Sequence, residues 1–364
     1  MNISKFFFVL SLVSFLAGCH LSTEKTVTKP PVRNIILMIG DGMGLNQQYA
    51  VYTANKGSFE VERCPYVGLV KTYSANHYVT ESAAAATAIA CGEKTGNGMV
   101  GMRSDSTRLK SMLEYAADND LATGIVITSY LPCATPAAFV AHVHHRDEYE
   151  NIAMAYVQSK INVCIGGGRK FFENRTDSVN LTEMMKAKGF RVAYTMDEVK
   201  AIQEGNLLGL LAEDSLRRYP ARGEMLPEAT AATIQILNRN EKGFFLMVES
   251  SQIDWAGEYN DQKHLVDEML DFNRTIKVAL DFAEKEGQTL VIITGDHETG
   301  GMTITNGNLQ TGELTINFSI KMDHSGVPVP VYAFGPGAEL FTGIFDNTEF
   351  LPKVLNLFGI NEFQ

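Results

Sequence analysis

Candidate metal-ligating carboxylates and imidazoles occur at four places along the chain, each close to a run of apolar residues. Carboxylate oxygens and imidazole nitrogens are the ligands that zinc and similar ions take in proteins. Each place alone is also compatible with a structural role, because Asp-Gly is common turn chemistry and a lone histidine is more often structural than a ligand. The candidate metal ligands are Asp41, Glu249, Asp254, Glu258, Asp296, His297 and His324.

The segment from Glu249 to Glu258 favours a metal site over a solvated acidic face. Asp254 and Glu258 are four residues apart, so they share one face if the segment is helical. Two like charges on one face require a cation. The apolar residues Ile253 and Trp255 indicate buried surroundings, in which unpaired carboxylates are costly.

Ser82 is the candidate nucleophile. It begins an alanine-rich segment, Ser82-Ala-Ala-Ala-Ala-Thr87, which is predicted to be helical. A phosphate on Ser82 would face free backbone N–H groups and the positive end of the helix. The alternative is a serine that only caps the helix.

Arg146 is the candidate phosphate ligand, because a guanidinium group can hold two phosphate oxygens at once. It ends the stretch that begins at Cys133 and contains Thr135. An ordinary surface arginine is the alternative, and spacing alone does not reject it.

Apolar runs of strand length alternate with amphipathic stretches along most of the chain. This alternation predicts an α/β fold with a large, mostly parallel central sheet flanked by helices. The predicted strands are 34–39, 67–72, 124–128, 161–165, 244–248, 290–294 and 329–334. The predicted helices are 111–118, 149–160, 229–238, 265–285 and 348–358, and 302–319 is predicted as a surface hairpin.

Three of the predicted strands run directly into candidate ligands. The run 34–39 is followed by Asp41, the run 244–248 by Glu249 and the run 290–294 by Asp296. Open α/β sheets bind ligands at the carboxyl ends of their strands. One shared site at that edge is therefore expected.

The N-terminal residues have the pattern of an export signal. Lys5 precedes an apolar run, 6–16, which leads through Ala17-Gly18 into Cys19. Leu16-Ala17-Gly18-Cys19 is similar to a bacterial lipobox, which implies cleavage before Cys19 and a lipid on its thiol. A plain cleaved signal peptide is the alternative. The apolar run is shorter than the roughly 20 residues of a membrane-spanning helix.

These observations predict a lipoprotein signal peptide over 1–18, a tether over 19–31 and a single catalytic domain over 32–364. The predicted location is exported, periplasmic or on the cell surface, with contact to the membrane only through the lipid. The net charge of −11 argues against nucleic acid and anionic membrane surfaces as partners. Buried free thiols are expected for three of the later cysteines, Cys64, Cys91 and Cys164.

Taken together and in order, the motifs resemble those of the alkaline phosphatases, over a span from about residue 35 to 338. This resemblance implies a three-layer alkaline phosphatase-like fold and hydrolysis of phosphate monoesters through a phosphoserine. Phosphorylated small molecules are the implied substrates, and a homodimer is the implied assembly. The motifs are Thr80-Glu81-Ser82-Ala83-Ala84, Ala134-Thr135-Pro136-Ala137-Ala138, Met247-Val248-Glu249, Gln252-Ile253-Asp254, Gly295-Asp296-His297-Glu298-Thr299-Gly300-Gly301 and His324-Ser325-Gly326.

The resemblance also implies three metal sites, two for zinc and one usually for magnesium. The first zinc site would also bind the Ser82 oxygen, and Arg146 would hold the substrate phosphate. The implied ligands are Asp41, Asp296 and His297 for the first zinc ion, Asp254, Glu258 and His324 for the second, and Asp41, Cys133, Thr135 and Glu249 for the third ion.

Two of these positions depart from the family pattern. Glu258 stands where the family has histidine, which replaces a nitrogen donor by a harder oxygen. His264 is a substitute candidate, although its spacing from Asp254 puts it on another helical face. Cys133 stands where relatives have aspartate or histidine, and a thiolate is a poor magnesium ligand. A catalytically weak phosphate- or metal-binding lipoprotein and a related diesterase are therefore the alternative functions.

Overall fold

The computed structural model describes residues 32–361, so the predicted signal peptide, Cys19 and tether lie outside the described residues. The strands are β1 Asn34–Gly40, β2 Tyr66–Lys71, β3 Ala122–Tyr130, β4 Val163–Gly167, β5 Phe190–Ala193, β6 Asn206–Leu210, β7 Phe244–Ser250, β8 Thr289–Gly295, β9 Glu298–Thr299, β10 Met302–Gly307, β11 Leu314–Phe318, β12 His324–Ser325, β13 Val329–Phe334 and β14 Gly343–Asp346.

The α-helices are α1 Leu45–Ala54, α2 Ser82–Cys91, α3 Met112–Asp118, α4 Ala134–Ala137, α5 Tyr149–Gln158, α6 Lys170–Glu173, α7 Leu181–Ala187, α8 Met196–Ala201, α9 Met225–Leu237, α10 Gln252–Glu258, α11 Gln262–Glu286 and α12 Phe350–Phe358. Short 3₁₀ turns cover η1 Glu60–Arg63, η2 Ala338–Phe341 and η3 Asn347–Glu349.

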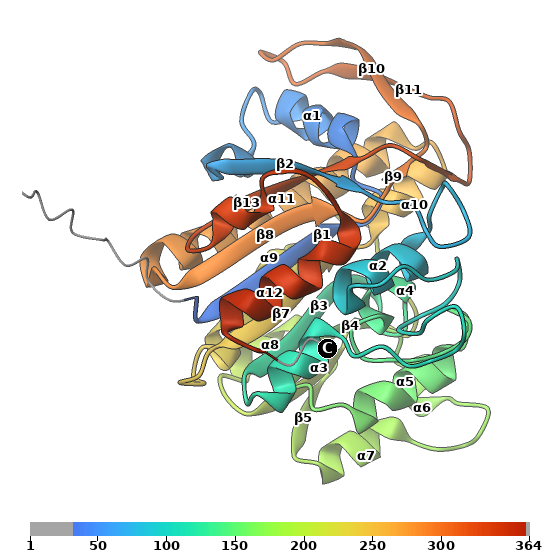
Figure 1. Ribbon diagram of the computed structural model, residues 1–364, viewed down its shortest axis with the longest axis vertical. Coiled ribbons are helices and arrows are strands. Elements are labelled where there is room, and N and C mark those ends of the chain that lie inside the picture. The colour runs from blue at the N-terminus through green and yellow to red at the C-terminus, as the bar shows by residue number, and fades with distance from the viewer. Residues whose placement is uncertain (1–31, 362–364) are drawn as a thin grey trace, which may run out of the picture.

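A ten-stranded sheet runs through the molecule in the order β14-β2-β13-β8-β1-β7-β3-β4-β6-β5 (Figure 1). Its neighbouring strands are parallel except at β13, which is antiparallel to both β2 and β8. Strands β1, β7 and β8 are buried along their whole length, as expected for the centre of a parallel sheet covered on both faces. The predicted fold class is confirmed.

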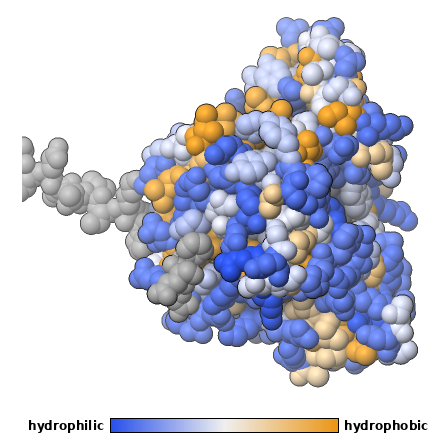
Figure 2. Space-filling model, turned by 45° about the vertical axis from the view of Figure 1, so that its right-hand side comes forward, coloured by the Kyte–Doolittle hydropathy of each residue, from blue (hydrophilic) through white to orange (hydrophobic). Residues whose placement is uncertain are grey.

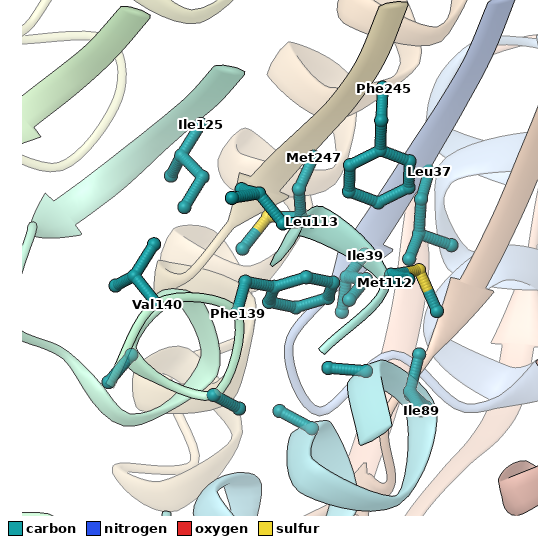
Figure 3. Packing of buried hydrophobic residues seen from close by; sticks show 14 of the residues in the cluster. Leu37, Ile39, Ile89, Met112, Leu113, Ile125, Phe139, Val140, Phe245 and Met247 are labelled. Atoms are coloured by element: carbon teal, nitrogen blue, oxygen red, sulfur yellow. The ribbon is translucent and has the colours of Figure 1, made fainter. Parts of the chain in front are cut away.

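Alternate residues of β1 pack into two separate hydrophobic cores, one on each face of the sheet. Ile35, Leu37 and Ile39 face the core that contains residues of α2, α3, α5 and α12. Figure 3 shows part of this core, where Phe139 lies between the sheet and the neighbouring helices. Ile36 and Met38 face the opposite core, with residues of α1, α9 and α11. The period of two residues in a strand thus produces the three layers.

All seven predicted strands and all five predicted helices are present, with shifts of a few residues at their ends. The predicted hairpin is β10 paired with β11. The prediction missed β5, β6 and β14, which are four or five residues long and lie at or near the edges of the sheet. Short strands of this kind have too few residues to show a clear period. The prediction also missed the two-residue strands β9 and β12 and the helices α1, α6, α7 and α8.

The molecular face in Figure 2 is mostly hydrophilic, and hydrophobic residues on it form small separate groups. Between residues 32 and 361 we find no helix with the length and apolar character needed to span a bilayer. Cys64, Cys91, Cys133 and Cys164 are buried free thiols, so the expectation for three of them is confirmed.

Candidate active site

The carboxyl ends of β1, β7 and β8 meet at one edge of the sheet, as the sequence predicts. Ile39 of β1 lies opposite Glu249 of β7 on one side and Thr294 of β8 on the other. Asp41 follows β1 and Asp296 follows β8, so these two carboxylates and that of Glu249 converge. All three residues are at most 3 % exposed.

The turn after β1 requires glycine at position 42. Gly42 has a φ of +71°, and its N–H donates to Asp296 Oδ1 at 3.0 Å. A Cβ atom on Gly42 would lie 2.6 Å from Thr299 Oγ1 and 2.9 Å from Asp254 Cα. The absence of a side chain therefore lets Asp41, Asp254 and Asp296 approach one another.

Ser82 is the first residue of α2, and its side chain points into the same cluster. Its Oγ lies 3.4 Å from Asp41 Oδ1 and 3.3 Å from His297 Nε2. The helix is capped by Glu81, whose carboxylate accepts the N–H groups of Ala83 and Ala84 at 2.9 and 2.8 Å. The expectation that free backbone N–H groups would face a phosphate on Ser82 is therefore wrong for these two groups, because Glu81 occupies them.

Potential ligand atoms form two groups, and the atoms of each group lie within 4.8 Å of one another. One consists of Asp41, Asp296 and His297, and the other of Asp254, His297 and His324. His297 belongs to both groups, and its ring stacks on that of His324 with the centroids 3.8 Å apart. The structure thus brings together five of the predicted ligands in two adjoining groups.

His324 reaches the sheet edge through a short pairing outside the main sheet. Strand β12 pairs antiparallel with β9, and His324 lies opposite Thr299. His324 Nδ1 is 2.8 Å from the Thr80 carbonyl oxygen, and Nε2 is 3.5 Å from Asp254 Oδ1. Thr299 Oγ1 donates to Asp254 Oδ1 and lies 3.2 Å from His297 Nδ1. Thr299 holds these ligands in place, and the sequence reasoning assigned it no role.

The buried carboxylates of the cluster would be stabilised in their charged form by a bound cation. Burial raises the pKa of Asp41 well above its ordinary value, and the nearby Asp296 adds to the shift. Burial likewise raises the pKa of Glu249 to about 8 and that of Asp296 to about 7. Both carboxylate oxygens of Glu249 and Oδ2 of Asp296 are buried without a hydrogen-bond partner. A divalent cation would satisfy these oxygens, so the residues present fit metal ions.

The two stacked imidazoles have opposite pKa shifts. Burial and, as the second cause, the charge on His324 lower the pKa of His297 to about 3. Burial also acts to lower the pKa of His324, but the hydrogen bond and charge of Asp254 outweigh it and raise that pKa to about 9. His297 is therefore a neutral imidazole, which is the form that binds metal.

Glu258 and Cys133 lie near the cluster but in neither group of ligand atoms. Glu258 is half-buried at the end of α10 and lines the cavity above the cluster. Cys133 precedes α4, and burial together with the charge of Glu249 raises its thiol pKa to about 11, so the thiol is protonated at neutral pH. Thr135 Oγ1 donates to Asp41 Oδ2 at 3.5 Å. His264 packs elsewhere, with Nε2 3.3 Å from Glu268 Oε1.

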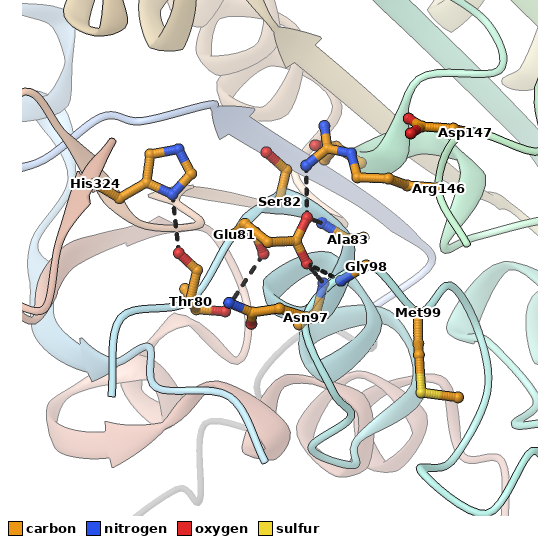
Figure 4. Close-up of polar contacts among 12 residues, drawn as sticks. Thr80, Glu81, Ser82, Ala83, Asn97, Gly98, Met99, Arg146, Asp147 and His324 are labelled. Carbon is orange, nitrogen blue, oxygen red and sulfur yellow. Dashed lines mark hydrogen bonds and ion pairs between the residues drawn. The ribbon is translucent and has the colours of Figure 1, made fainter. Parts of the chain in front are cut away.

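Arg146 lies across the cavity from His324 and is held by Glu81 (Figure 4). Its Nη1 donates to Glu81 Oε2 at 2.5 Å, and the other Glu81 oxygen accepts the N–H of Gly98 at 2.8 Å. Burial alone would raise the pKa of Glu81, but Arg146 and the backbone N–H groups lower it. Sequence reasoning missed this role, although an acidic residue directly before a helix is a capping signal.

A cavity of about 490 Å³ opens above the cluster. Ser82 and Arg146 lie on one side of it and His324 on the other (Figure 4), and Asp254, which also lines it, contacts His324. The full lining is His77, Val79, Thr80, Glu81, Ser82, Asn97, Arg146, Asp254, Trp255, Glu258, Met322, Asp323 and His324.

A serine hydroxyl among buried carboxylates and imidazoles, with an arginine across a cavity at the carboxyl edge of a parallel sheet, defines a metal-dependent hydrolase with a serine nucleophile. The sequence profile of the family described as alkaline phosphatase matches residues 32–319. The chain belongs to the alkaline phosphatase family and is a phosphoric monoester hydrolase.

Relatives match it over most of its length. Alkaline phosphatase 4 of Bacillus subtilis is 34 % identical, covering 92 % of this chain and 91 % of the relative. The alkaline phosphatase of Escherichia coli is 30 % identical over 89 % of this chain and 85 % of its own. The solved alkaline phosphatase of the Antarctic bacterium TAB5 is 38 % identical with a TM-score of 0.86, over 92 % of this chain and 99 % of that one.

Proposed function

We propose that Ser82 is the nucleophile of this phosphatase and is transiently phosphorylated, while Arg146 binds the non-bridging phosphate oxygens. The observation that carries this proposal is the position of Ser82 Oγ, 3.4 Å from Asp41 and 3.3 Å from His297 at the base of the cavity. Ser82 as a residue is 2 % exposed and lines the cavity, so a substrate would reach its hydroxyl through the cavity.

The described side chains would hold the metal ions in three places. We assign one zinc ion to Asp41, Asp296 and His297 and a second to Asp254 and His324, with Glu258 as a further ligand of the second ion. We assign a third ion to Asp41, Thr135 and Glu249, because the Glu249 oxygens are buried without partners. When bound, such ions supply Lewis acidity that favours the ionised form of a hydroxyl or water and neutralises phosphate charge.

Magnesium is our assignment for the third ion. A histidine-to-aspartate variant of the TAB5 phosphatase has been solved with magnesium bound in a site called M3. The neutral thiol of Cys133 adds no charge to the corresponding place here, so Asp41 and Glu249 would provide the anionic oxygens that magnesium prefers.

The side chains then act in two steps. Ser82 Oγ attacks the phosphorus, the bond to the substrate's alcohol oxygen breaks, and the alcohol leaves toward the side lined by Asp254 and His324. Water subsequently attacks the phosphoserine from that same side and releases inorganic phosphate. Arg146, fixed by Glu81, keeps the phosphoryl group oriented through both displacements.

The test compares p-nitrophenyl phosphate hydrolysis by the zinc- and magnesium-loaded protein with that of Ser82→Ala. Turnover should fall by at least about a thousandfold, because removal of a nucleophile leaves only binding and electrostatic effects. Ser58→Ala, at an exposed serine, is the control and should keep full activity. Mass spectrometry after an acid quench should find phosphate on the peptide that contains Ser82. Equal activity of wild type and Ser82→Ala, or zinc and phosphate binding without turnover, would reject the proposed mechanism.

We further propose that the chain is exported, carries a lipid on Cys19 and forms a homodimer. The lipobox-like residues Leu16-Ala17-Gly18-Cys19 support the anchor. Leu45 and Tyr49 of α1 are 59 % and 55 % exposed, which is consistent with a covered surface in a dimer. The expected results are release of a Cys19→Ser variant from the membrane fraction and twice the chain mass by sedimentation velocity. A membrane-bound Cys19→Ser variant or a monomer would contradict the respective proposal.

A further inference from the structure

One wall of the active-site cavity differs in chemistry from the side that holds the phosphate. We call the group Trp255, Glu258, Met322 and Asp323 the leaving-group wall, because these residues line the cavity next to Asp254 and His324. They come from α10 and from the segment just before β12. The alcohol part of a substrate whose phosphate lies between Ser82 and Arg146 would meet this wall.

The wall carries two carboxylates: that of Glu258, on which the charges of His324 and Arg146 act and which we assign to the second metal ion, and that of Asp323. Glu81 also lines the cavity, but its carboxylate is bound to Arg146 and to backbone N–H groups. Asp323 is exposed, and its Oδ1 accepts only the N–H of the next residue, at 2.8 Å. Neither Glu258 nor Asp323 forms an ion pair within residues 32–361, and no lysine lines the cavity.

Met322 is held beside the cavity in an unfavourable backbone conformation. Its φ is +56°, in the left-handed region that residues with a long side chain seldom adopt. Its N–H donates to the carbonyl of Glu258 at 2.9 Å, and the residue is 52 % exposed. This conformation places the exposed, apolar side chain of Met322 on the lining of the cavity.

Trp255 provides an aromatic surface on the same wall. It lies three residues before Glu258 in α10, so the two side chains project from neighbouring positions on one side of the helix. Trp255 is half-buried, which leaves part of its ring facing the cavity. An indole ring is the side chain best suited to attract a cation through its π face.

We propose that the leaving-group wall selects phosphate monoesters whose alcohol carries an ammonium or quaternary ammonium group. The cation would contact the Trp255 ring and the Asp323 carboxylate, while Met322 would cover its methyl or methylene groups. Neutral alcohols would lose the charge interaction, and anionic alcohols would be repelled. This proposal rests on the phosphomonoesterase function and adds a preference to it.

The test uses two substrates of nearly equal shape, phosphocholine and its uncharged carbon isostere, 3,3-dimethylbutyl phosphate. The quantity of interest is the ratio of their kcat/KM values in the metal-loaded enzyme. Trp255→Leu and Asp323→Asn should each lower this ratio about threefold to fivefold, and the double variant on the order of tenfold. The two substrates also differ from each other in the basicity of the leaving alcohol. The informative quantity is therefore the change of the kcat/KM ratio from wild type to variant. The ratio should also fall at high salt.

Glu241→Gln is the matched control, because it removes one negative charge from an exposed position that does not line the cavity. It should leave the ratio unchanged. An equal ratio in wild type, both single variants and the double variant would overturn the proposed preference. That result differs from failure of the proposed mechanism, in which Ser82→Ala would hydrolyse p-nitrophenyl phosphate as fast as wild type.

Discussion

Asp41 contacts groups from three separate parts of the chain. Its carboxylate lies 3.4 Å from the hydroxyl of Ser82, 3.5 Å from that of Thr135 and 3.5 Å from His297 Nε2. One residue thus contacts the candidate nucleophile, Thr135 and the imidazole that belongs to both groups of potential ligand atoms. The partners of Asp41 lie far from it in the sequence, so its own Asp-Gly motif is a weak functional signal. The complete set of motifs includes these partners and is therefore a strong one.

Sequence reasoning found the residues of the site whose chemistry is distinctive and missed those that position them. Carboxylates after buried strands converge because the strands are parallel, so Asp41, Glu249 and Asp296 could be predicted together. Thr299 acts through distances that no spacing rule specifies, whereas the position of Glu81 directly before a helix was a capping signal that the sequence reasoning did not use. The contribution of His297 to both ligand groups also depends on ring placement and was not predicted.

Metal-free protein should lose stability as the pH rises from about 4 to about 8. The folded-state pKa values of Glu249, about 8, and Asp296, about 7, lie above the ordinary values of 4.5 and 3.8. The folded state therefore binds more protons than the unfolded state in this range, and the stabilising difference present at low pH is lost as pH rises through the folded pKa values.

Urea unfolding of the chelated protein between pH 4 and 8 measures this effect. The control is chelated Glu249→Gln, whose free energy of unfolding should fall less steeply over the same range. Parallel pH profiles for the two proteins would show that Glu249 does not titrate as expected.

At the scale of elements, the buried central strands were predictable and the edge strands were not. β1, β7 and β8 have uninterrupted apolar runs because both of their faces are covered. β14 has an exposed Ile344 and only four residues, so neither length nor alternation marks it as a strand. Its place in the sheet is set by pairing with β2, which only the tertiary structure reveals.

The loop before α9 is fastened to α11 by a buried ion-pair cluster. Arg222 donates two hydrogen bonds to the carboxylate of Glu268, at 2.8 and 2.6 Å, and one to Asp271 at 2.6 Å. The three side chains are at most 1 % exposed. Sequence reasoning assigned these residues no role, since their partners are more than 40 positions away.

Arg222→Ala should lower the free energy of unfolding by about 3–5 kcal/mol, because it removes the arginine bound to the buried Glu268 and leaves the buried Asp271 with Arg274 as its remaining arginine. Arg218→Ala is the matched control, since Arg218 pairs with Asp261 on the surface, and it should cost less than about 1 kcal/mol. Chemical denaturation of the metal-loaded proteins gives both values. Similar losses in the two variants would argue against a structural role of the buried cluster.

At the scale of the whole molecule, the candidate site depends on strands from both halves of the chain. β1 and β3 precede residue 131, and β7 and β8 follow residue 243, yet they are neighbours in one sheet. Because the two hydrophobic cores share this sheet, neither can unfold without exposing the other.

We therefore expect the metal-loaded protein to unfold in a single calorimetric transition, and chelation to shift that transition to lower temperature, since ions that bind only the folded state stabilise it. Differential scanning calorimetry with and without a chelator, followed by zinc addition, checks both expectations. Two resolved transitions in the loaded protein would indicate units that unfold independently.

The direction of β1 separates the point where the chain enters the sheet from the place where substrate binds. The N–H of Arg33 donates to the carbonyl of Gln288, just before β8 begins, whereas Asp41 lies beyond the other end of β1 (Figure 1). Seven residues of extended strand, roughly 20 Å, lie between them. If the chain is held to a membrane through Cys19, the attached end and the cavity occupy opposite ends of the sheet. The anchored end of the sheet would then not be the end at which the cavity opens, and dissolved phosphate esters could enter the cavity without passing the point of attachment.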